Sequence, residues 1–203
     1  MVSRTGPRRS ESVRLAVLNA ADDLLVEQGF AGTTIEGIAT RAGVAKQTIY
    51  RWWKSKVDIL LDALAEDARE ALAWREPAGT PAEDLAAHLH RVAGFFGEPA
   101  GQVLRALLGH AQLDKGAAAA LRAGFLREQR ERDLEGLRAV VRRHTGSEPD
   151  GATLVRLADL LLGPLHYRVL VLGEQPDTAL LDASARLVLE LAARDRKEPE
   201  GAA

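Results

Sequence analysis

The chain has 203 residues, of which 46% are hydrophobic and 28% are charged, so it is long enough to bury a sizeable core and has the composition of a folded globular protein. It contains no cysteine, which excludes disulfide bonds and thiolate metal sites. The net charge is −2, but residues 1–56 carry nine Lys and Arg against five Asp and Glu, so a basic end precedes an acidic body and indicates a polyanionic partner for that end alone.

Neither a secretory signal nor a membrane span is expected. The opening residues, MVSRTGPRRSES, have no apolar core, and the longest apolar stretch, residues 154–172, is interrupted by Arg156, Asp159, His166 and Arg168. Together with the absence of cysteine, this predicts a cytoplasmic protein.

Helical periodicity dominates the chain and β-type alternation is scarce, which predicts an all-α fold of about nine helices. Caps and terminal glycines place the first four helices at residues 11–28, from 33 or 34 to 42, 46–52 and 55–72. Ser55 with Asp58, and Thr80 with Glu83, have the spacing of capping boxes, the second followed by Pro81 at the first helical position. The remaining helices are predicted at residues 80–96, 102–111, 116–144, 152–172 with a kink at Pro164, and from 177 onward.

Residues 33–56, TTIEGIATRAGVAKQTIYRWWKSK, hold two short helical patterns around one glycine, as a helix-turn-helix does. Gly43 can adopt the left-handed conformation that ends a helix, and Ala39 is small enough for the crossing of two helices. Ile49 and Trp53 are four residues apart and take the inward face, so residues 46, 47, 50 and 51 share the outward face. Lys and Gln there can reach base edges, whereas Thr, Tyr, Arg and Lys can bind phosphates. The alternative is a merely solvated helix, which rarely exposes Tyr, Trp and two basic residues together.

Residues 33–60, TTIEGIATRAGVAKQTIYRWWKSKVDIL, resemble the signature of the TetR family of bacterial transcriptional regulators almost end to end. The preceding stretch RLAVLNAADDLLVEQGFAGTT is similar to the family's first helix, and LLLGPLHYRVLVLGEQPD resembles a helix found in many members. The resemblance implies an N-terminal three-helix helix-turn-helix domain and a C-terminal helical domain for ligand binding and dimerisation. A flexible basic arm would then occupy residues 1–10, and the DNA-binding domain residues 11–71, with the helix-turn-helix motif at about 34–53. The C-terminal domain would occupy residues 80–195, followed by a disordered tail at residues 196–203.

The resemblance also implies a role for each matching residue. Lys46 and Gln47 would face bases at the start of the recognition helix. Thr34 would cap its helix and contact a phosphate, and Thr48 and Trp52 would touch the DNA backbone. Tyr50 would pack on a sugar or a thymine methyl while bonding a phosphate. Lys56 would grip a phosphate at the N-terminus of its helix, and Glu36 would face the groove without reading a base. The complete predicted DNA-binding set is Thr34, Lys46, Gln47, Thr48, Tyr50, Arg51, Trp52, Lys54 and Lys56.

Two positions depart from the family pattern. Ala45 stands where many members have a Ser that caps the recognition helix, and losing such a cap costs about 0.5–2 kcal/mol. Gly37 replaces a residue that is often acidic and weakens its helix by about 1 kcal/mol relative to Ala. Within the arm, Arg4, Arg8 and Arg9 would either contact DNA or form a plain basic tail.

A two-fold operator needs a two-fold protein, and the last two helices have excess apolar surface. By resemblance they form a four-helix dimer interface, the alternative being an intramolecular core. The predicted interface residues are Leu161, Leu165, Val169, Leu180, Leu187, Val188 and Leu191.

A pocket for a small, hydrophobic or aromatic effector is expected among the central helices. Its predicted lining residues are Phe96, His110, Phe125, His166 and Tyr167, with Trp74 and Phe95 as further candidates. Each of these side chains is individually more often a packing residue than a ligand contact.

The resulting hypothesis is a ligand-responsive repressor that binds a palindromic operator in double-stranded DNA as a homodimer. No cofactor, metal or membrane is part of it. The motifs G-x-S-x-G, P-loop and G-x-G-x-x-G are absent, and His88 and His90 diverge because they lie two residues apart on a helix, so an enzyme is not expected. A helical adaptor whose basic motif binds an acidic protein is the remaining alternative.

Overall fold

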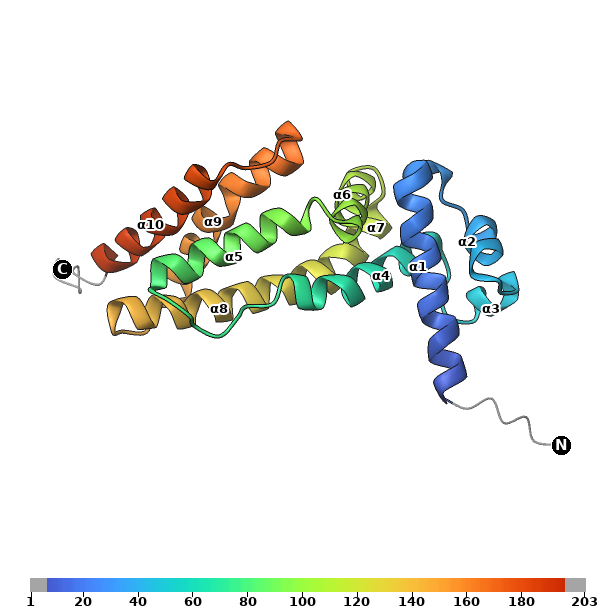
Figure 1. Cartoon of the computed structure of the whole chain (residues 1–203), viewed down its shortest axis with the longest axis horizontal. Coiled ribbons are helices and arrows are strands. Elements are labelled where there is room, and N and C mark those ends of the chain that lie inside the picture. Colours follow the sequence, from blue (N-terminus) through green and yellow to red (C-terminus); the bar gives the residue numbers. More distant parts are fainter. Residues whose placement is uncertain (1–6, 196–203) are drawn as a thin grey trace. The chain divides into compact units, whose positions relative to one another are not determined.

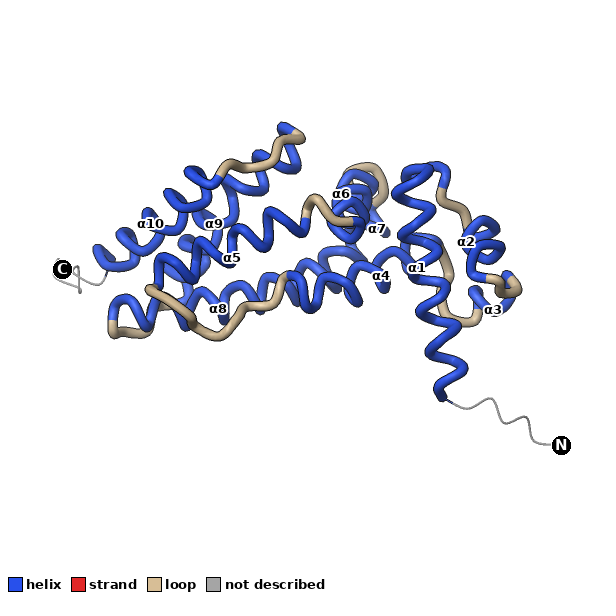
Figure 2. The backbone as a smooth tube through the Cα atoms, viewed as in Figure 1, coloured by secondary structure: helices blue, strands red, loops and turns tan. Residues whose placement is uncertain are grey.

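The computed structural model describes residues 7–195, and every regular element in that range is a helix (Figure 2). The predicted all-α fold is therefore confirmed. The described residues form two compact units: residues 7–69 join residues 97–125 in the first, and residues 70–96 join residues 126–195 in the second. Across the described range, no helix is long and apolar enough to cross a membrane.

The first unit contains the helix-turn-helix. Its elements are α1 (Pro7–Gly32), α2 (Ile35–Ala42), α3 (Lys46–Tyr50), most of α4 (Lys56–Ala71), α6 (Pro99–Ala111), α7 (Lys115–Leu121) and most of the π-helical turn η1 (Arg122–Leu126). α1 packs against α2 and α6, and α6 packs against α7. The sequence assigned residues 97–125 to the C-terminal domain, whereas the structure groups them with the N-terminal helices because α6 rests on α1.

α1 begins at Pro7, four residues before the predicted start, because Pro is well suited to the first helical position. Gly29 breaks the helix where its end was predicted, with φ 69° and ψ 176°. Arg8 and Arg9 therefore belong to the helix. Arg4 and the predicted tail, residues 196–203, lie outside the described residues.

Local capping fixes the ends of α2. The Thr34 hydroxyl oxygen accepts a hydrogen bond from the Gly37 N–H at 3.0 Å, which satisfies one free donor of the first turn. At the other end Gly43 is left-handed, with φ 67°, and the Val44 N–H reaches back to the Ala39 carbonyl at 3.0 Å. The predicted stop at Gly43 is confirmed, and Thr34 caps a helix whose first residue is Ile35.

Both predicted capping boxes are also confirmed. The Ser55 N–H donates to Asp58 Oδ2 at 2.9 Å, and the Asp58 N–H donates to Ser55 Oγ at 3.2 Å, at the start of α4. Thr80 and Glu83 make the same reciprocal pair, with distances of 2.8 and 3.3 Å, at the start of α5 (Pro81–Phe95). The start points of both helices are thus set by residues close in sequence.

The second unit is a bundle of α5, α8 (Arg127–Thr145), α9 (Gly151–His166) and α10 (Thr178–Asp195), with the π-helical segment η2 (Tyr167–Leu172) continuing α9. α10 packs along α5, α8 and α9, and α8 packs against α5 and α9 (Figure 1). The fully buried side chains of this bundle include Leu85, Leu89, Leu137, Leu154, Leu157, Leu161, Leu165 and Val188.

Besides the start of α1, several helices differ from the sequence expectation, and α3 ends at Tyr50 instead of residue 52. The single helix predicted at residues 116–144 is broken at Gly124, where φ −97° and ψ −109° leave the helical region. α6 begins at Pro99, inside the predicted break, because Pro occupies its first turn without losing a needed N–H. The kink expected at Pro164 takes the form of the π-helical segment that starts at Tyr167.

Two carboxyl groups meet inside the first unit. Asp22 on α1 is buried close to Asp67 on α4, and its Oδ1 has no hydrogen-bond partner among the described residues. Burial, followed by the negative charge of Asp67, raises the pKa of Asp22 to about 7. Burial also raises the pKa of Asp67. The folded chain therefore holds a proton on Asp22 at pH values where an unfolded Asp has lost it.

Asp22→Asn is expected to stabilise the chain by about 1–3 kcal/mol at about pH 8, because Asn imitates the protonated carboxyl. The wild-type penalty is absent below the unfolded pKa near 4, grows as the pH rises, and is complete above about 7. The gain measured by urea unfolding should therefore shrink between about pH 8 and pH 5. Glu190→Gln, which neutralises an exposed carboxylate on α10 in the second unit, is the matched control. A gain independent of pH would contradict the buried pair.

Candidate nucleic-acid interface

The recognition helix α3 has one buried and one exposed face. Ile49 is 0% exposed and Trp53, just after the helix, is buried, with its indole Nε1–H donating to Asp62 Oδ2 at 2.9 Å. Tyr50 on the opposite side is 49% exposed. The inward and outward faces predicted from the spacing are therefore confirmed.

Lys46 is held by two neighbours on the exposed face. Its ammonium forms an ion pair with the carboxylate of Glu36 on α2 and lies 5.6 Å from the centre of the Tyr50 ring. The hydrogen bond to Glu36 raises the pKa of Lys46, and the same bond lowers the pKa of Glu36. Glu36 was expected only to face the groove. Its pairing with Lys46 joins two helices and has no signal in the local sequence.

The other predicted backbone contacts are spread around α3. Thr34 is exposed and has used a lone pair as the α2 cap, so its hydroxyl hydrogen is still available to a phosphate. Thr48 is half-buried, and Trp52 is exposed with its ring edge-on to Trp53 at 5.3 Å. The exposed side chains that make no hydrogen bond or ion pair within residues 7–195 include Gln47, Arg51 and Lys54.

Lys56 turns toward the protein. Its ammonium donates to the carbonyl oxygens of Phe30 and Thr33, the second at 3.0 Å, and lies 4.2 Å from the centre of the Phe30 ring. Burial lowers its pKa. The predicted phosphate contact would have to use the remaining N–H of this ammonium, because two of its donors hold the end of α1 against the start of α4.

The two departures at the motif have visible consequences. Ala45 precedes α3 and gives it no side-chain cap, as the sequence implied. At Gly37 a Cβ would lie 3.2 Å from Thr34 Oγ1 and 3.4 Å from Leu24 Cδ1. A side chain there would crowd the cap of α2, so the glycine suits this position despite its low helix propensity.

The predicted dimer residues divide between core and surface. Leu161, Leu165, Val169 and Val188 are buried within the second unit, so they belong to the protomer's own core. This corrects the choice of those four residues, because helical periodicity identifies an apolar face without identifying what covers it. Leu187 is 51% exposed, and Leu180 and Leu191 are half-buried. The other exposed apolar side chains on these elements are Val155, Leu160, Tyr167, Leu170, Val171 and Leu172.

The predicted effector residues also fall into groups. Phe96 and His166 meet edge-on in the second unit, with ring centres 5.8 Å apart. Burial lowers the pKa of His166 and so favours its neutral form. In the first unit, His110 packs on Phe30 at 4.5 Å and Phe125 is buried. Tyr167 is exposed.

Comparisons with known proteins identify both parts of the chain. The family profile "Bacterial regulatory proteins, tetR family" matches residues 17–63, and the profile "Tetracyclin repressor-like, C-terminal domain" matches residues 75–188. The chain is 33% identical over 175 residues to YdeS, an uncharacterized HTH-type transcriptional regulator of Bacillus subtilis. That alignment covers 86% of this chain and 87% of the relative.

Solved structures have the same architecture. The TetR family transcription regulator SCO0332 is 32% identical, has a TM-score of 0.72, and is matched over 97% of its chain and 88% of this one. A TetR transcriptional regulator from Agrobacterium tumefaciens is 25% identical, with a TM-score of 0.65 over 94% of its chain and 92% of this one. The similarity therefore extends through both compact units.

Proposed function

Since the chain belongs to the TetR family of DNA-binding bacterial transcriptional regulators, we propose that it is a repressor that binds a palindromic operator as a homodimer and is released by a small-molecule effector. DNA binding is supported most directly by the exposed side chains on the face of α3 opposite the buried Ile49 and Trp53. Its Lys, Gln, Tyr and Arg side chains have the donors that base edges and phosphates accept.

Within this proposal, Lys46 and Gln47 read bases, because they begin the recognition helix and point outward. Arg51 and Lys54 contribute charge to the phosphate backbone. The set is completed by residues that contact phosphate or sugar, namely Thr34, Thr48, Tyr50, Trp52 and Lys56.

When Lys46 contacts DNA, its ion pair with Glu36 must break or weaken. Glu36→Gln is therefore expected to raise affinity for every duplex and to steepen the salt dependence, because it removes one negative charge beside the groove. Fluorescence anisotropy against specific and scrambled duplexes at several salt concentrations measures both effects. The matched control is Glu27→Gln, which breaks an exposed ion pair with Arg41 outside α3. An unchanged salt slope for Glu36→Gln would contradict the competition.

Lys56 supports the DNA-binding surface indirectly, through its contacts with the backbone. By binding the carbonyl oxygens of Phe30 and Thr33, it fixes the backbone that leads into the Thr34 cap. Its charge stays close to the first turn of α4, where free backbone N–H groups also favour an anion.

We assign the dimer interface to the exposed apolar side chains of α9, η2 and α10. Leu187 on α10 and Val171 on η2 are each more than half exposed, and Leu160 on α9 and Leu172 on η2 are also exposed. Exposed apolar surface that gathers in a patch marks association sites in soluble proteins. A self-complementary patch gives the two-fold symmetry that a palindrome requires.

Leu187→Glu is expected to convert the dimer to monomers and to weaken operator binding, because it places a charge in an apolar contact. Sedimentation velocity at micromolar concentration measures the first effect. Leu113→Glu is the matched control, because Leu113 is 90% exposed in the first unit and lies outside the assigned interface. A wild-type monomer at that concentration would remove both the interface and the palindrome from the proposal.

We place the hydrophobic or aromatic effector in the second unit, where Phe96 and the neutral form of His166 meet edge-on. α4 is one uninterrupted helix from Lys56 to Ala71, so a change at its C-terminal end can reach the residues that begin it. The coupling must be reciprocal: operator DNA would weaken effector binding by the factor by which effector weakens DNA binding, typically about 1–3 kcal/mol.

Salt-dependent binding of the wild-type chain to duplex DNA tests the proposal against the acidic-protein adaptor. Affinity for duplex DNA should fall linearly on a log–log plot against salt concentration, with a slope of about −0.9 for each phosphate neutralised. A slope of several units supports direct contact with the DNA backbone. No binding to any duplex at low salt would favour the adaptor.

A further inference from the structure

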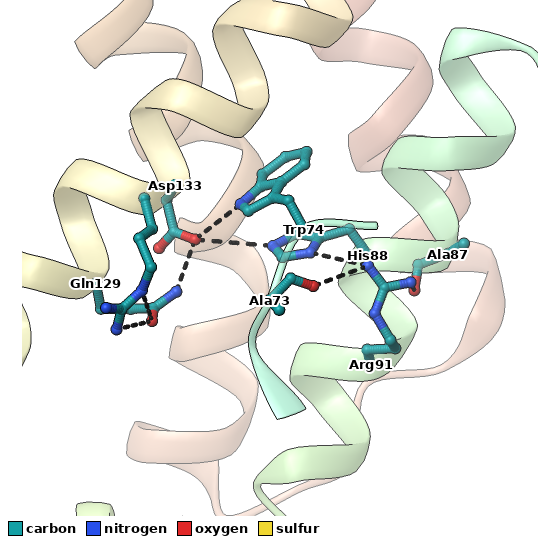
Figure 3. Close-up of polar contacts among 8 residues, drawn as sticks. Ala73, Trp74, Ala87, His88, Arg91, Gln129 and Asp133 are labelled. Atoms are coloured by element: carbon teal, nitrogen blue, oxygen red, sulfur yellow. Dashed lines mark hydrogen bonds and ion pairs between the residues drawn. The ribbon is translucent and has the colours of Figure 1, made fainter. Parts of the chain in front are cut away.

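The side chain of Trp74 lies in a narrow slot in the second unit, formed by His88 on α5 and by Asp133 and Gly136 on α8. It lies three residues beyond the end of α4 and before the start of α5. Its indole stacks on the imidazole of His88 with ring centres 3.8 Å apart and planes inclined by 21°. The indole Nε1–H donates to Oδ1 of Asp133 on α8 at 3.2 Å (Figure 3). One flat ring thus makes both a stacking contact and a directed hydrogen bond.

Gly136 forms the floor of this slot. A Cβ at that position would lie only 2.0 Å from Cδ2 of the indole, so the ring lies against bare helix backbone. Gly136 is inside α8, where glycine costs about 1 kcal/mol relative to Ala. Gly136 therefore lowers the stability of α8 at the position where the indole lies against the helix.

The wall of the slot carries more polar groups than packing one indole requires. Asp133 is buried and also accepts from Gln129 Nε2 at 2.9 Å. His88 is 1% exposed, and its Nδ1 faces the Arg91 guanidinium at 3.3 Å. Because guanidinium is always a donor, Nδ1 accepts and the neutral ring carries its proton on Nε2. That atom has no hydrogen-bond partner among the described residues and lies 3.8 Å from Asp133 Oδ1.

A buried donor without an acceptor costs roughly 1–3 kcal/mol. A cluster built only for packing would be more stable with apolar side chains at these positions. The polar wall around His88 and Asp133 is therefore better explained by recognition of a ring than by stability.

Trp74 also lines two hollows in the surface of the second unit. Each has a volume of about 580 Å³, and both are lined by Trp74 and Gly136. The first hollow is also lined by Arg75, Arg142, Arg143 and Glu76, and the second by Glu128, Glu131, Glu135 and Arg132. The volumes are in the range of roughly 300–1,000 Å³ that ligand pockets occupy.

We propose that this slot is an effector site for a planar aromatic molecule with a ring N–H, which displaces the Trp74 indole and takes its place. The ligand ring stacks on His88, its N–H donates to Asp133 Oδ1, and its edges extend into the two hollows. The Trp74 indole thus occupies the position of the ligand ring when no ligand is bound. The effector role rests on the proposed function, whereas occupation of the slot does not.

Displacement has a direct route to the DNA-binding end of the chain. Only Leu72 and Ala73 separate Trp74 from the last residue of α4, and Leu72 is buried. Moving the indole out of its slot therefore pulls on the C-terminal end of the helix that begins at Lys56.

The first test uses the wild-type chain labelled with 5-fluorotryptophan, which has three Trp residues and so three ¹⁹F resonances. Trp74→Phe assigns the resonance of Trp74. Titration with indole is expected to move that resonance toward its solvent-exposed position, while 1-methylindole, which lacks the N–H, should need at least roughly tenfold higher concentration. A Trp74 resonance that stays in place up to the solubility limit of indole would overturn the proposal. Equal responses to the two probes would overturn the role of Asp133.

The second test empties the slot. Trp74→Ala is expected to bind indole at least roughly tenfold more tightly than wild type, because the ligand no longer competes with a tethered ring at high effective concentration. Asp133→Leu in the same background should abolish the preference for indole over 1-methylindole. If that double variant does not fold, the probe pair in Trp74→Ala alone still decides. Absence of saturable indole binding by a folded Trp74→Ala chain would contradict the slot.

Duplex DNA binding is measured on the same samples by anisotropy. DNA binding without indole binding would overturn the slot and leave the proposed function standing. Indole binding without any duplex binding would leave the slot standing and overturn the proposed function.

Discussion

Gly136→Ala is expected to destabilise the chain by about 1–3 kcal/mol, although Ala is the better helix former by about 1 kcal/mol. The added methyl would sit 2.0 Å from the Trp74 indole, far inside van der Waals contact, and the backbone of α8 cannot retreat without breaking its own packing. The indole would leave its stack on His88 and its hydrogen bond to Asp133. Urea unfolding measures the loss of stability, and the ¹⁹F resonance of Trp74 reports the displacement.

Gly94→Ala is the matched control for this substitution. Gly94 lies inside α5 and is exposed, and a methyl group added there would meet no atom within 4 Å outside its own helix. This change should stabilise the chain by up to about 1 kcal/mol. If both variants gained stability equally, the indole would not be confined by Gly136 and the slot would lose its floor.

The second large effect is expected at the recognition helix. Gln47→Ala should lose about 1–3 kcal/mol of operator affinity per contact and relax base preference at one symmetric pair of positions. The reason is that Gln47 is exposed on α3 and its amide makes no hydrogen bond within residues 7–195. Binding of a randomised operator library measures the preference at each position.

Arg51→Ala is the comparison, because Arg51 is exposed immediately after α3 and is assigned to phosphate. It should weaken all sequences alike and reduce the salt slope by about one unit. A uniform loss across the library for Gln47→Ala as well would remove its role as a base reader.

The helix ends show how far local sequence determines this fold. Thr34, the Ser55–Asp58 pair and the Thr80–Glu83 pair each satisfy free backbone groups within three residues, so their helices begin where the sequence predicts. The break at Gly124 was not predicted, because a single glycine inside a helical pattern is usually tolerated and only its backbone angles reveal the interruption.

Contacts between distant residues were beyond local reasoning. Glu36 and Lys46 meet because α2 and α3 cross, and Lys56 turns inward because the end of α1 offers two carbonyl oxygens. The same limit explains the dimer residues: Val188 and Leu187 are neighbours in a helical apolar pattern, yet one is in the core and the other is on the surface. Trp74 was a candidate by residue type alone, and its slot depends on Gly136, which lies 62 positions away in the sequence.

Selection of duplexes from a fully randomised library by the wild-type chain tests the central claim most directly. The bound fraction is sequenced after washing at moderate salt. The proposal predicts enrichment of one palindrome, with half-sites whose centres are about 34–36 Å apart, or one helical turn, so that two copies of α3 enter successive major grooves. Enrichment of a single asymmetric half-site, or no enrichment above the starting library, would contradict a homodimeric regulator that reads its operator through α3.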